Sequence, residues 1–253
     1  MIKLLKSEFR KTRRRYVFIT AILITAFGLV WSLHGRYNEI ALRFGWMSFL
    51  YQLPLTNAIF MPLLSIIVSS RLCDIEHKGM MLKQLAVVTD KGKIYDAKLI
   101  YGLGMVVICC LINWFVTIAF GCIIGFYGDV PIRLYLLYLL FTVVPTIAVY
   151  IFQHTLSLLF RNQALAFFAG ITGTFCGLFS MFLPQLPWLR RLFIWGYYGA
   201  LQFVGLFGWT KEARYENAYF EVMGFDWLSF GVLIAAAILM YIIGRSLFCR
   251  KEV

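Results

Sequence analysis

Several long runs of uncharged apolar residues constrain this chain more than any other feature of its sequence. A run of 18 or more such residues is typical of a membrane-spanning helix. Because hydrocarbon offers the backbone no hydrogen-bond partners, each run must form a helix that satisfies its own amides and carbonyls. Hydrophobic residues make up 61% of the chain and charged residues only 14%, against about 45–50% and about 25% in soluble domains. We therefore predict an all-α polytopic membrane protein.

The apolar runs predict six transmembrane spans within a single domain, residues 1–253. Their approximate limits are 16–33, 49–70, 99–126, 134–160, 164–183 and 227–244. About 20 residues cross the hydrocarbon core, so the longer third and fourth spans are expected to tilt or to project on the cytoplasmic side. The first span is expected to be retained, because no signal-peptide cleavage site follows it.

Lysine and arginine are distributed unequally between the two sides of the predicted bundle. Of the 24 basic residues, 17 lie in residues 1–15, in the loop 71–98, in the turn after the fourth span or in the C-terminal tail. The positive-inside rule then predicts cytoplasmic N- and C-termini and a cytoplasmic 71–98 loop. We interpret the net charge of +12 as a membrane-surface signature. No nucleic-acid partner is expected, because no folded basic domain is visible.

The nearly apolar segment 192–209 is open to two interpretations. As a seventh span it would place the basic C-terminal tail outside the cell, against the charge distribution. We therefore favour a re-entrant helical hairpin that dips into the outer leaflet, within an extracellular region at 185–226. The seventh span remains the alternative.

Catalytic and metal-binding motifs are not visible in the sequence. There is no P-loop, no H-E-x-x-H and no G-x-S-x-G, and the six cysteines and three histidines have no metal-ligand spacing. We therefore predict no catalytic residue, no metal site and no cofactor in this chain. The six spans also contain no Asp, Glu, Lys or Arg, which ion-coupled transporters usually need, although backbone ligands for sodium remain conceivable.

A polar stretch at 71–85 separates two apolar runs. Apolar residues and one glycine recur in it at helical spacing and predict an amphipathic cytoplasmic helix over 74–86; they are Leu72, Ile75, Gly79, Leu82 and Leu85. Such a helix either lies on the inner leaflet or docks into a partner's groove. Acidic residues among the lysines, such as Asp74 and Glu76, favour the partner.

The whole layout resembles the membrane subunit of a type-2 ABC exporter. Residues 1–15, "MIKLLKSEFRKTRRR", are similar to the family's leading interfacial helix. Residues 74–100, "DIEHKGMMLKQLAVVTDKGKIYDAKLI", resemble its coupling-helix loop, with Lys98 entering the third span. The family often has a proline where this chain has Val87–Val88–Thr89. Residues 186–201, "LPWLRRLFIWGYYGAL", are similar to the outer hairpin of permeases that act in lantibiotic immunity and bacitracin resistance.

The resemblance implies a multi-pass permease domain in a bacterial plasma membrane. Its implied partners are the lipid bilayer, a second permease that is identical or homologous, and a dimer of cytoplasmic ABC ATPases that binds ATP and Mg. It implies that a coupling surface contacts the ATPase through Asp74, Glu76, Gly79, Leu82 and Leu85. Our candidates for an outer substrate surface are Trp188, Trp195, Tyr197, Tyr198 and Gln202, with an interfacial aromatic belt as the alternative.

The expected function is export of an amphipathic, lantibiotic-type peptide from the membrane, which gives self-immunity or resistance. Export of another hydrophobic drug or of a lipid is the alternative within this class. A non-transporting membrane scaffold or sensor subunit is the alternative from a different class, and an ion-driven transporter is a third.

Overall fold

The computed structural model describes the chain except residues 36, 78–80, 184, 211–217 and 252–253. Six helices alternate in direction along one bundle: α2 (Val17–Leu33), α4 (Gly45–His77), α6 (Lys91–Ile124), α7 (Ile132–Leu159), α8 (Gln163–Met181) and α11 (Trp227–Arg250). Five of them are long and apolar enough to cross a membrane. The sixth, α2, reaches that length only together with α1 (Ile2–Arg13), and the axes of these two helices differ by 69°. The prediction of a polytopic helical membrane protein is confirmed.

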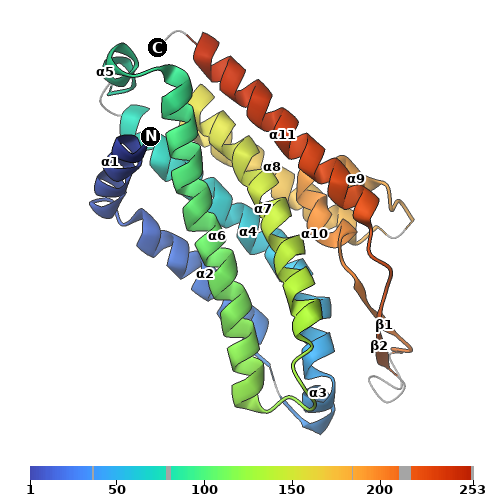
Figure 1. Ribbon diagram of the computed structural model, residues 1–253. Helices are drawn as coiled ribbons and strands as arrows, with labels where there is room; N and C mark the ends of the chain where they lie inside the picture. The colour runs from blue at the N-terminus through green and yellow to red at the C-terminus, as the bar shows by residue number, and fades with distance from the viewer. Residues whose placement is uncertain (36, 78–80, 184, 211–217, 252–253) are drawn as a thin grey trace.

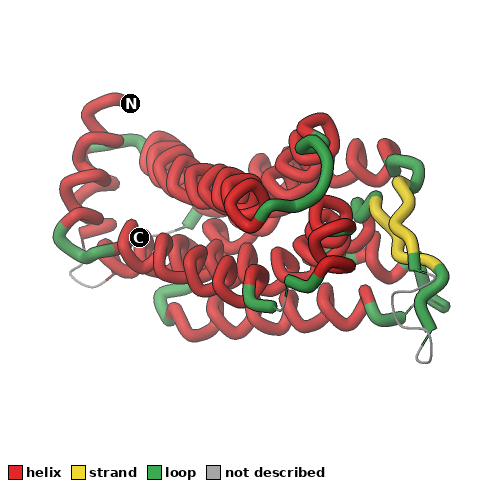
Figure 2. The backbone as a smooth tube through the Cα atoms, turned by 90° about the horizontal axis from the view of Figure 1, so that it is seen from below, coloured by secondary structure: helices red, strands yellow, loops and turns green. Residues whose placement is uncertain are grey.

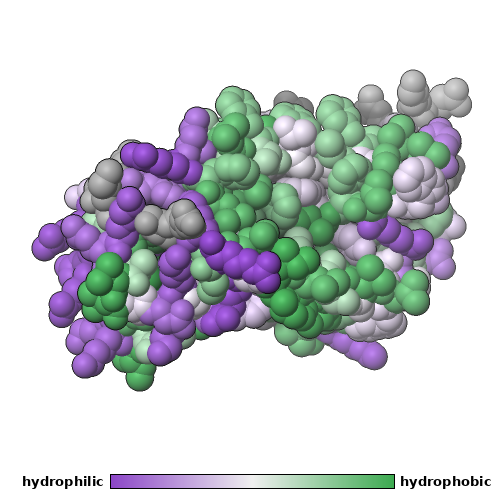
Figure 3. All heavy atoms as spheres, turned by 90° about the horizontal axis from the view of Figure 1, so that it is seen from above, coloured by the Kyte–Doolittle hydropathy of each residue, from purple (hydrophilic) through white to green (hydrophobic). Residues whose placement is uncertain are grey.

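The chain begins and ends at the same end of the bundle, where α1 and the last turn of α11 lie (Figure 1). Seen from above, hydrophilic side chains gather over this end, and hydrophobic side chains cover much of the rest (Figure 3). Large apolar residues are exposed on the flanks of several helices; examples are Phe27, Phe115, Phe168 and Leu228. Exposed apolar surface on this scale fits a lateral face that contacts lipid.

The two longest helices are α4 with 33 residues and α6 with 34 residues. At about 1.5 Å per residue each is about 50 Å long, which exceeds a hydrocarbon core of about 30 Å. The third and fourth spans are both longer than the core requires, as predicted, since α7 has 28 residues. The prediction missed that the second span is longer still than the fourth. Its helix continues beyond residue 70 to His77, since Leu72, Cys73 and Ile75 are all buried in the bundle.

The all-α prediction misses a small antiparallel hairpin. Strands β1 (Val204–Phe207) and β2 (Tyr219–Val222) pair with Val204 opposite Val222 and Phe207 opposite Tyr219. The stacked rings of Phe207 and Tyr219, 5.8 Å apart, add a cross-strand contact of the kind that stabilises sheets. The hairpin lies far from the two termini (Figure 2).

The segment before β1 contains only short helical turns: α9 (Leu189–Leu192), η1 (Ile194–Gly196) and α10 (Tyr197–Ala200). None exceeds four residues, so residues 192–209 do not form a seventh spanning helix. Trp195 packs against Gly173 and Gly177 of α8, where a Cβ atom would lie only 2.5 Å from the tryptophan. Small residues allow such close approach in membrane bundles. The depth of this segment in the outer leaflet stays a prediction.

Close packing of three helices depends on Gly102 of α6. A methyl group there would overlap the hydroxyl of Tyr150 on α7 and lie 2.9 Å from Leu72 on α4, whereas a Cβ at Gly104 would meet nothing within 4 Å. We predict that Gly102→Ala destabilises the protein by about 1–3 kcal/mol through overpacking. Gly104→Ala should leave stability unchanged or slightly higher, because glycine is unfavourable inside a helix. Thermal unfolding of the detergent-purified variants measures this, and equal behaviour of the pair would contradict it.

Candidate coupling site at the end that carries the termini

The short helix α5 (Met81–Val88) lies at the end of the bundle that carries both termini (Figure 1). Leu82 is only 5% exposed and belongs to the hydrophobic core, and Leu85 packs against that core. Val87 and Val88, by contrast, are 87% and 84% exposed. Covering such apolar surface with a partner is favourable, because it removes that surface from water. The helix α5 is thus anchored on one face and open on another.

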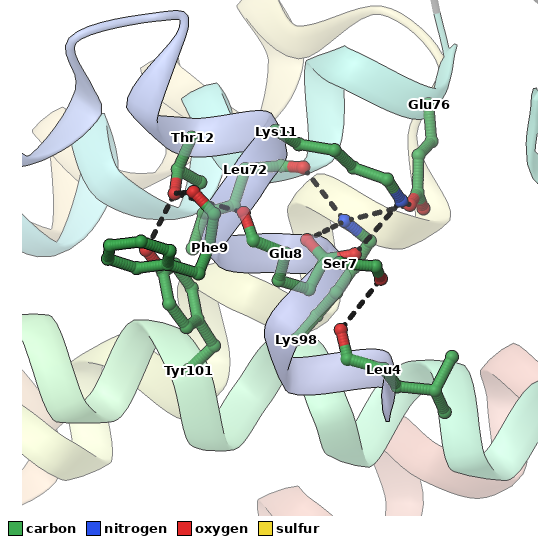
Figure 4. A network of polar contacts seen from close by, with 10 residues as sticks. All are labelled: Leu4, Ser7, Glu8, Phe9, Lys11, Thr12, Leu72, Glu76, Lys98 and Tyr101. Carbon is green, nitrogen blue, oxygen red and sulfur yellow. Dashed lines mark hydrogen bonds and ion pairs between the residues drawn. The ribbon is translucent and has the colours of Figure 1, made fainter. Parts of the chain in front are cut away.

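A buried ion-pair network joins α1, α4 and α6 beside α5 (Figure 4). The Lys98 ammonium of α6 lies 2.9 Å from Glu8 Oε2 of α1 and 3.1 Å from Glu76 Oε1 of α4. It also donates a hydrogen bond to the Leu72 carbonyl, 3.0 Å away. Lys11 completes the network, at 3.1 Å from Glu8 and 2.9 Å from Glu76. One lysine therefore holds three helices together.

Charge balance makes this network tolerable in the protein interior. The side chains of Lys98 and Glu76 are each only 1% exposed, and that of Glu8 is 6% exposed. Taking isolated charges out of water is costly, and pairing with complementary charges offsets that cost. Two carboxylates here face two ammonium groups. Glu76 Oε2 has no hydrogen-bond partner among the described residues. Both lysines contact Glu76 through its other oxygen, Oε1.

The first turns of α6 are also tied to α11. Asp96 accepts hydrogen bonds from the Tyr241 hydroxyl at 2.9 Å and from Arg245 Nε at 3.1 Å. At the end of α11, Lys251 donates to the Leu158 and Leu159 carbonyls of α7 at 3.1 and 2.8 Å. Burial lowers the pKa of Lys251, and the carbonyl end of α7 favours a cation there. The start of α6 is thus a junction between α1, α4 and α11.

The residues of the expected coupling surface fall on two described elements. Asp74 and Glu76 belong to α4, which is described up to His77, and Leu82 and Leu85 belong to α5, which is described from Met81; Gly79 lies outside the described residues. Asp74 is partly buried on α4. Glu76 lies in the ion-pair network, and Leu82 and Leu85 face the bundle. The apolar residues that α5 exposes are instead Met81, Val87 and Val88.

Sequence reasoning missed the roles of Glu8 and Lys11 in the network. One signal was available: Glu8 is the only acid among the seven basic residues of 1–15. A lone carboxylate on the apolar side of a basic helix, beside Leu5 and Phe9, points to a buried cationic partner. Lys98 was noted only for its place at the start of the third span.

The five candidate substrate residues do not form one surface. Trp188 is 56% exposed, whereas Trp195 is 8% and Tyr197 and Tyr198 are each 3% exposed. The Tyr198 hydroxyl lies 2.9 Å from Thr146 Oγ1 of α7. The Gln202 amide donates to the Tyr51 carbonyl of α4 at 3.2 Å. The buried members therefore attach the outer segment to the bundle and present no exposed surface for a substrate.

One acidic side chain of the outer region is already engaged. Asp226 caps α11 by accepting from the Ser229 amide and hydroxyl, and it pairs with Arg191 at 2.7 Å. Burial alone would raise the pKa of Asp226, but these hydrogen bonds and the arginine lower it. Asp226 is therefore not free to attract a cationic substrate. Glu212 and Glu216 lie outside the described residues.

A small cavity opens at the end of the bundle opposite α5, between the end of α2, the start of α4, the short helix α3 (Glu39–Arg43) and β2. Its volume is about 310 Å³. Polar and aromatic side chains line it, including Ser32, Asn38, Phe44, Gln52 and Phe220. This volume is at the lower limit of small-molecule sites, about 300–1,000 Å³, so the cavity does not enclose a peptide. Among the described residues no group of three or more His, Cys, Asp or Glu side chains gathers to hold a metal ion.

The bundle and its helical junction define a multi-pass helical membrane protein. Residues 4–177 match the family model described as "ABC-2 family transporter protein". Because the match covers more than half of the chain, the protein belongs to the ABC-2 transporter family. It is a non-catalytic membrane permease component of an ABC transporter, and the family implies an ABC ATPase partner. No curated protein and no solved structure matches the chain.

The network yields a stability prediction. Lys98→Met leaves two buried carboxylates with one partner, so it should destabilise the protein by about 3–5 kcal/mol. Adding Glu76→Gln restores charge balance and should recover part of that loss. Lys83→Met, at an exposed position on α5, is the matched control and should have little effect. Thermal unfolding in detergent measures all three, and a Lys98→Met protein as stable as the control would refute the role of the network.

Proposed function

We propose that this chain is the permease subunit of an ATP-driven exporter that removes an amphipathic, lantibiotic-type peptide from a bacterial plasma membrane. The observation that carries the coupling part is the pair of exposed valines, Val87 and Val88, on a helix whose other face is anchored in the bundle. A cytoplasmic ATPase that covers these valines removes apolar surface from water. Among the described residues of α5, the only other exposed large apolar side chain is that of Met81.

The coupling path follows from what α5 and its neighbours contact. ATP-driven closure of an ATPase dimer moves α5, and Leu82 passes that motion to the core between α4 and α6. The network around Lys98 keeps the ends of α4 and α6 together with α1, so these helices move as a unit. Both long helices continue toward the outer end. In this proposal both termini are cytoplasmic, and two permeases, identical or homologous, pair above the two ATPases.

The cargo part of the proposal is supported by the character of the surfaces. The outer cavity of about 310 Å³ is too small to enclose a peptide, while the flanks of the bundle are apolar and exposed. A substrate that already lies in the membrane needs no enclosed site within one subunit. An amphipathic peptide fits this geometry. The sequence resemblance of residues 186–201 to lantibiotic-immunity permeases is the second support for this cargo.

The docking role of α5 can be tested by co-purification. Val87→Asp/Val88→Asp places charge where an apolar contact is proposed, so we expect loss of a stoichiometric ATPase from the tagged complex, with normal amounts of folded permease. Gln84→Asp adds an acid at an exposed polar position of the same helix and should retain the ATPase. Mass spectrometry of the purified complex gives both results. Retention of the ATPase by the double variant would exclude this contact.

The cargo can be tested in cells that express the permease together with the ATPase that co-purifies with it. We expect the minimal inhibitory concentration of a cationic lanthionine peptide to rise several-fold, and Val87→Asp/Val88→Asp to abolish that rise. Protection against a hydrophobic drug but not against the peptide would assign the other cargo. No protection against either compound, and no cargo-stimulated ATP hydrolysis, would leave the scaffold or sensor role.

A further inference from the structure

An apolar groove follows the elbow between α1 and α2. It has a volume of about 700 Å³, within the range of about 300–1,000 Å³ that ligand sites occupy. Its walls come from α1, from the start of α2 and from one face of α6. Apolar side chains form most of them; they include Leu5, Phe9, Ile19, Ile100, Met105 and Ile108. Its shape and lining suit an acyl chain.

The rim of this groove is basic. Arg13 lines it, and Arg14 and Arg15 follow in the break between the two helices. All three arginines are exposed, and none forms an ion pair with an acidic side chain in the described part of the chain. Lys11 and Lys98 of the same region are, in contrast, fully engaged with Glu8 and Glu76. The groove therefore combines apolar walls with uncompensated positive charge at one edge.

The turn that forms the elbow is itself unusual. Tyr16 has a φ of 55° and is the only residue other than glycine with a positive φ in the described chain. Such a conformation costs free energy for a bulky residue and persists only where its surroundings maintain it. Tyr16 also lines the groove and is 67% exposed. A ligand in the groove would cover this side chain and support the turn.

We propose that the elbow is a binding site for one anionic phospholipid. An acyl chain lies in the groove against α6, and the phosphate group meets Arg13, Arg14 and Arg15. Charge complementarity selects this occupant, because basic residues at a membrane surface attract anionic headgroups. This site rests on the membrane location of the family and is independent of the peptide cargo.

A second copy of the chain fits the groove less well. A symmetric contact places the same patch on both subunits, so it would bring the two arginine clusters toward each other. Like charges across an interface are unfavourable. A lipid phosphate, in contrast, neutralises them.

Lipid titration followed by native mass spectrometry tests the site. The purified full-length protein is titrated with phosphatidylglycerol and, separately, with phosphatidylcholine of the same acyl chains. We expect one phosphatidylglycerol to bind about tenfold more tightly than phosphatidylcholine. Arg13→Gln/Arg14→Gln/Arg15→Gln should remove that preference, since these side chains carry the positive charge that distinguishes an anionic from a zwitterionic headgroup. Arg161→Gln, at an exposed position elsewhere on the same predicted side, should leave it intact.

A second variant probes the apolar part without changing charge. Gly104 lines the groove, and a side chain there meets open space. Gly104→Phe should therefore fill the groove and lower the affinity for both lipids at least about fivefold. Gly231→Phe on α11, where a Cβ also meets nothing within 4 Å, is the matched control and should bind lipid normally. Equal affinity for the two lipids in the unaltered protein would overturn the proposal. So would a protein dimer that Gly104→Phe converts to monomers.

Discussion

The burial of Lys98 sets the arrangement of the whole end that carries α5. Burying a charged lysine, here with 1% of its side chain exposed, has a desolvation cost that only nearby carboxylates can offset. Glu8 of α1 and Glu76 of α4 supply these carboxylates, and the Leu72 carbonyl accepts a further hydrogen bond from the Lys98 ammonium. Because each acid comes from a different helix, the chain can neutralise Lys98 only by bringing α1 and α4 onto α6. One charge therefore determines the packing of three helices.

The same requirement places the polar residues up to His77 on α4. Glu76 reaches Lys98 only if α4 continues as a helix past residue 70, so the polar residues that follow the apolar run belong to α4 and not to a separate docking helix. What remains for α5 is eight residues. Leu82 attaches them to the core, and Val87 and Val88 are left at the exposed end. The apolar side chains that α5 exposes are therefore not the ones that amphipathic spacing alone selects.

Apolar runs predicted the spanning helices well, because each such helix satisfies its own backbone and needs no partner to be recognised. The contacts between helices were beyond the same reasoning. Nothing in local spacing pairs Glu8 with a lysine 90 positions away. Trp195, Tyr197 and Tyr198 read equally well as an exposed belt, and only the glycines of α8 that receive Trp195 reveal an inward position. The pairing of β1 with β2 was also beyond that reasoning, because eleven residues separate the two strands.

The helix α1 faces two different electrostatic environments, and this gives it a role in both proposals. On one side Glu8 and Lys11 are neutralised inside the junction with α4 and α6, and a hydrogen bond of 2.6 Å joins the Thr12 and Tyr101 hydroxyls. At its other end Arg13, Arg14 and Arg15 are exposed, and none of them pairs with an acid in the part of the chain that the structure describes. Breaking the inner contacts leaves buried charges, so α1 must follow α4 and α6 when they move. The elbow after α1 turns at Tyr16, next to these arginines. In the two proposals, motion that starts at α5 reaches α1 through the junction, and the lipid bound at the arginines acts on the same helix.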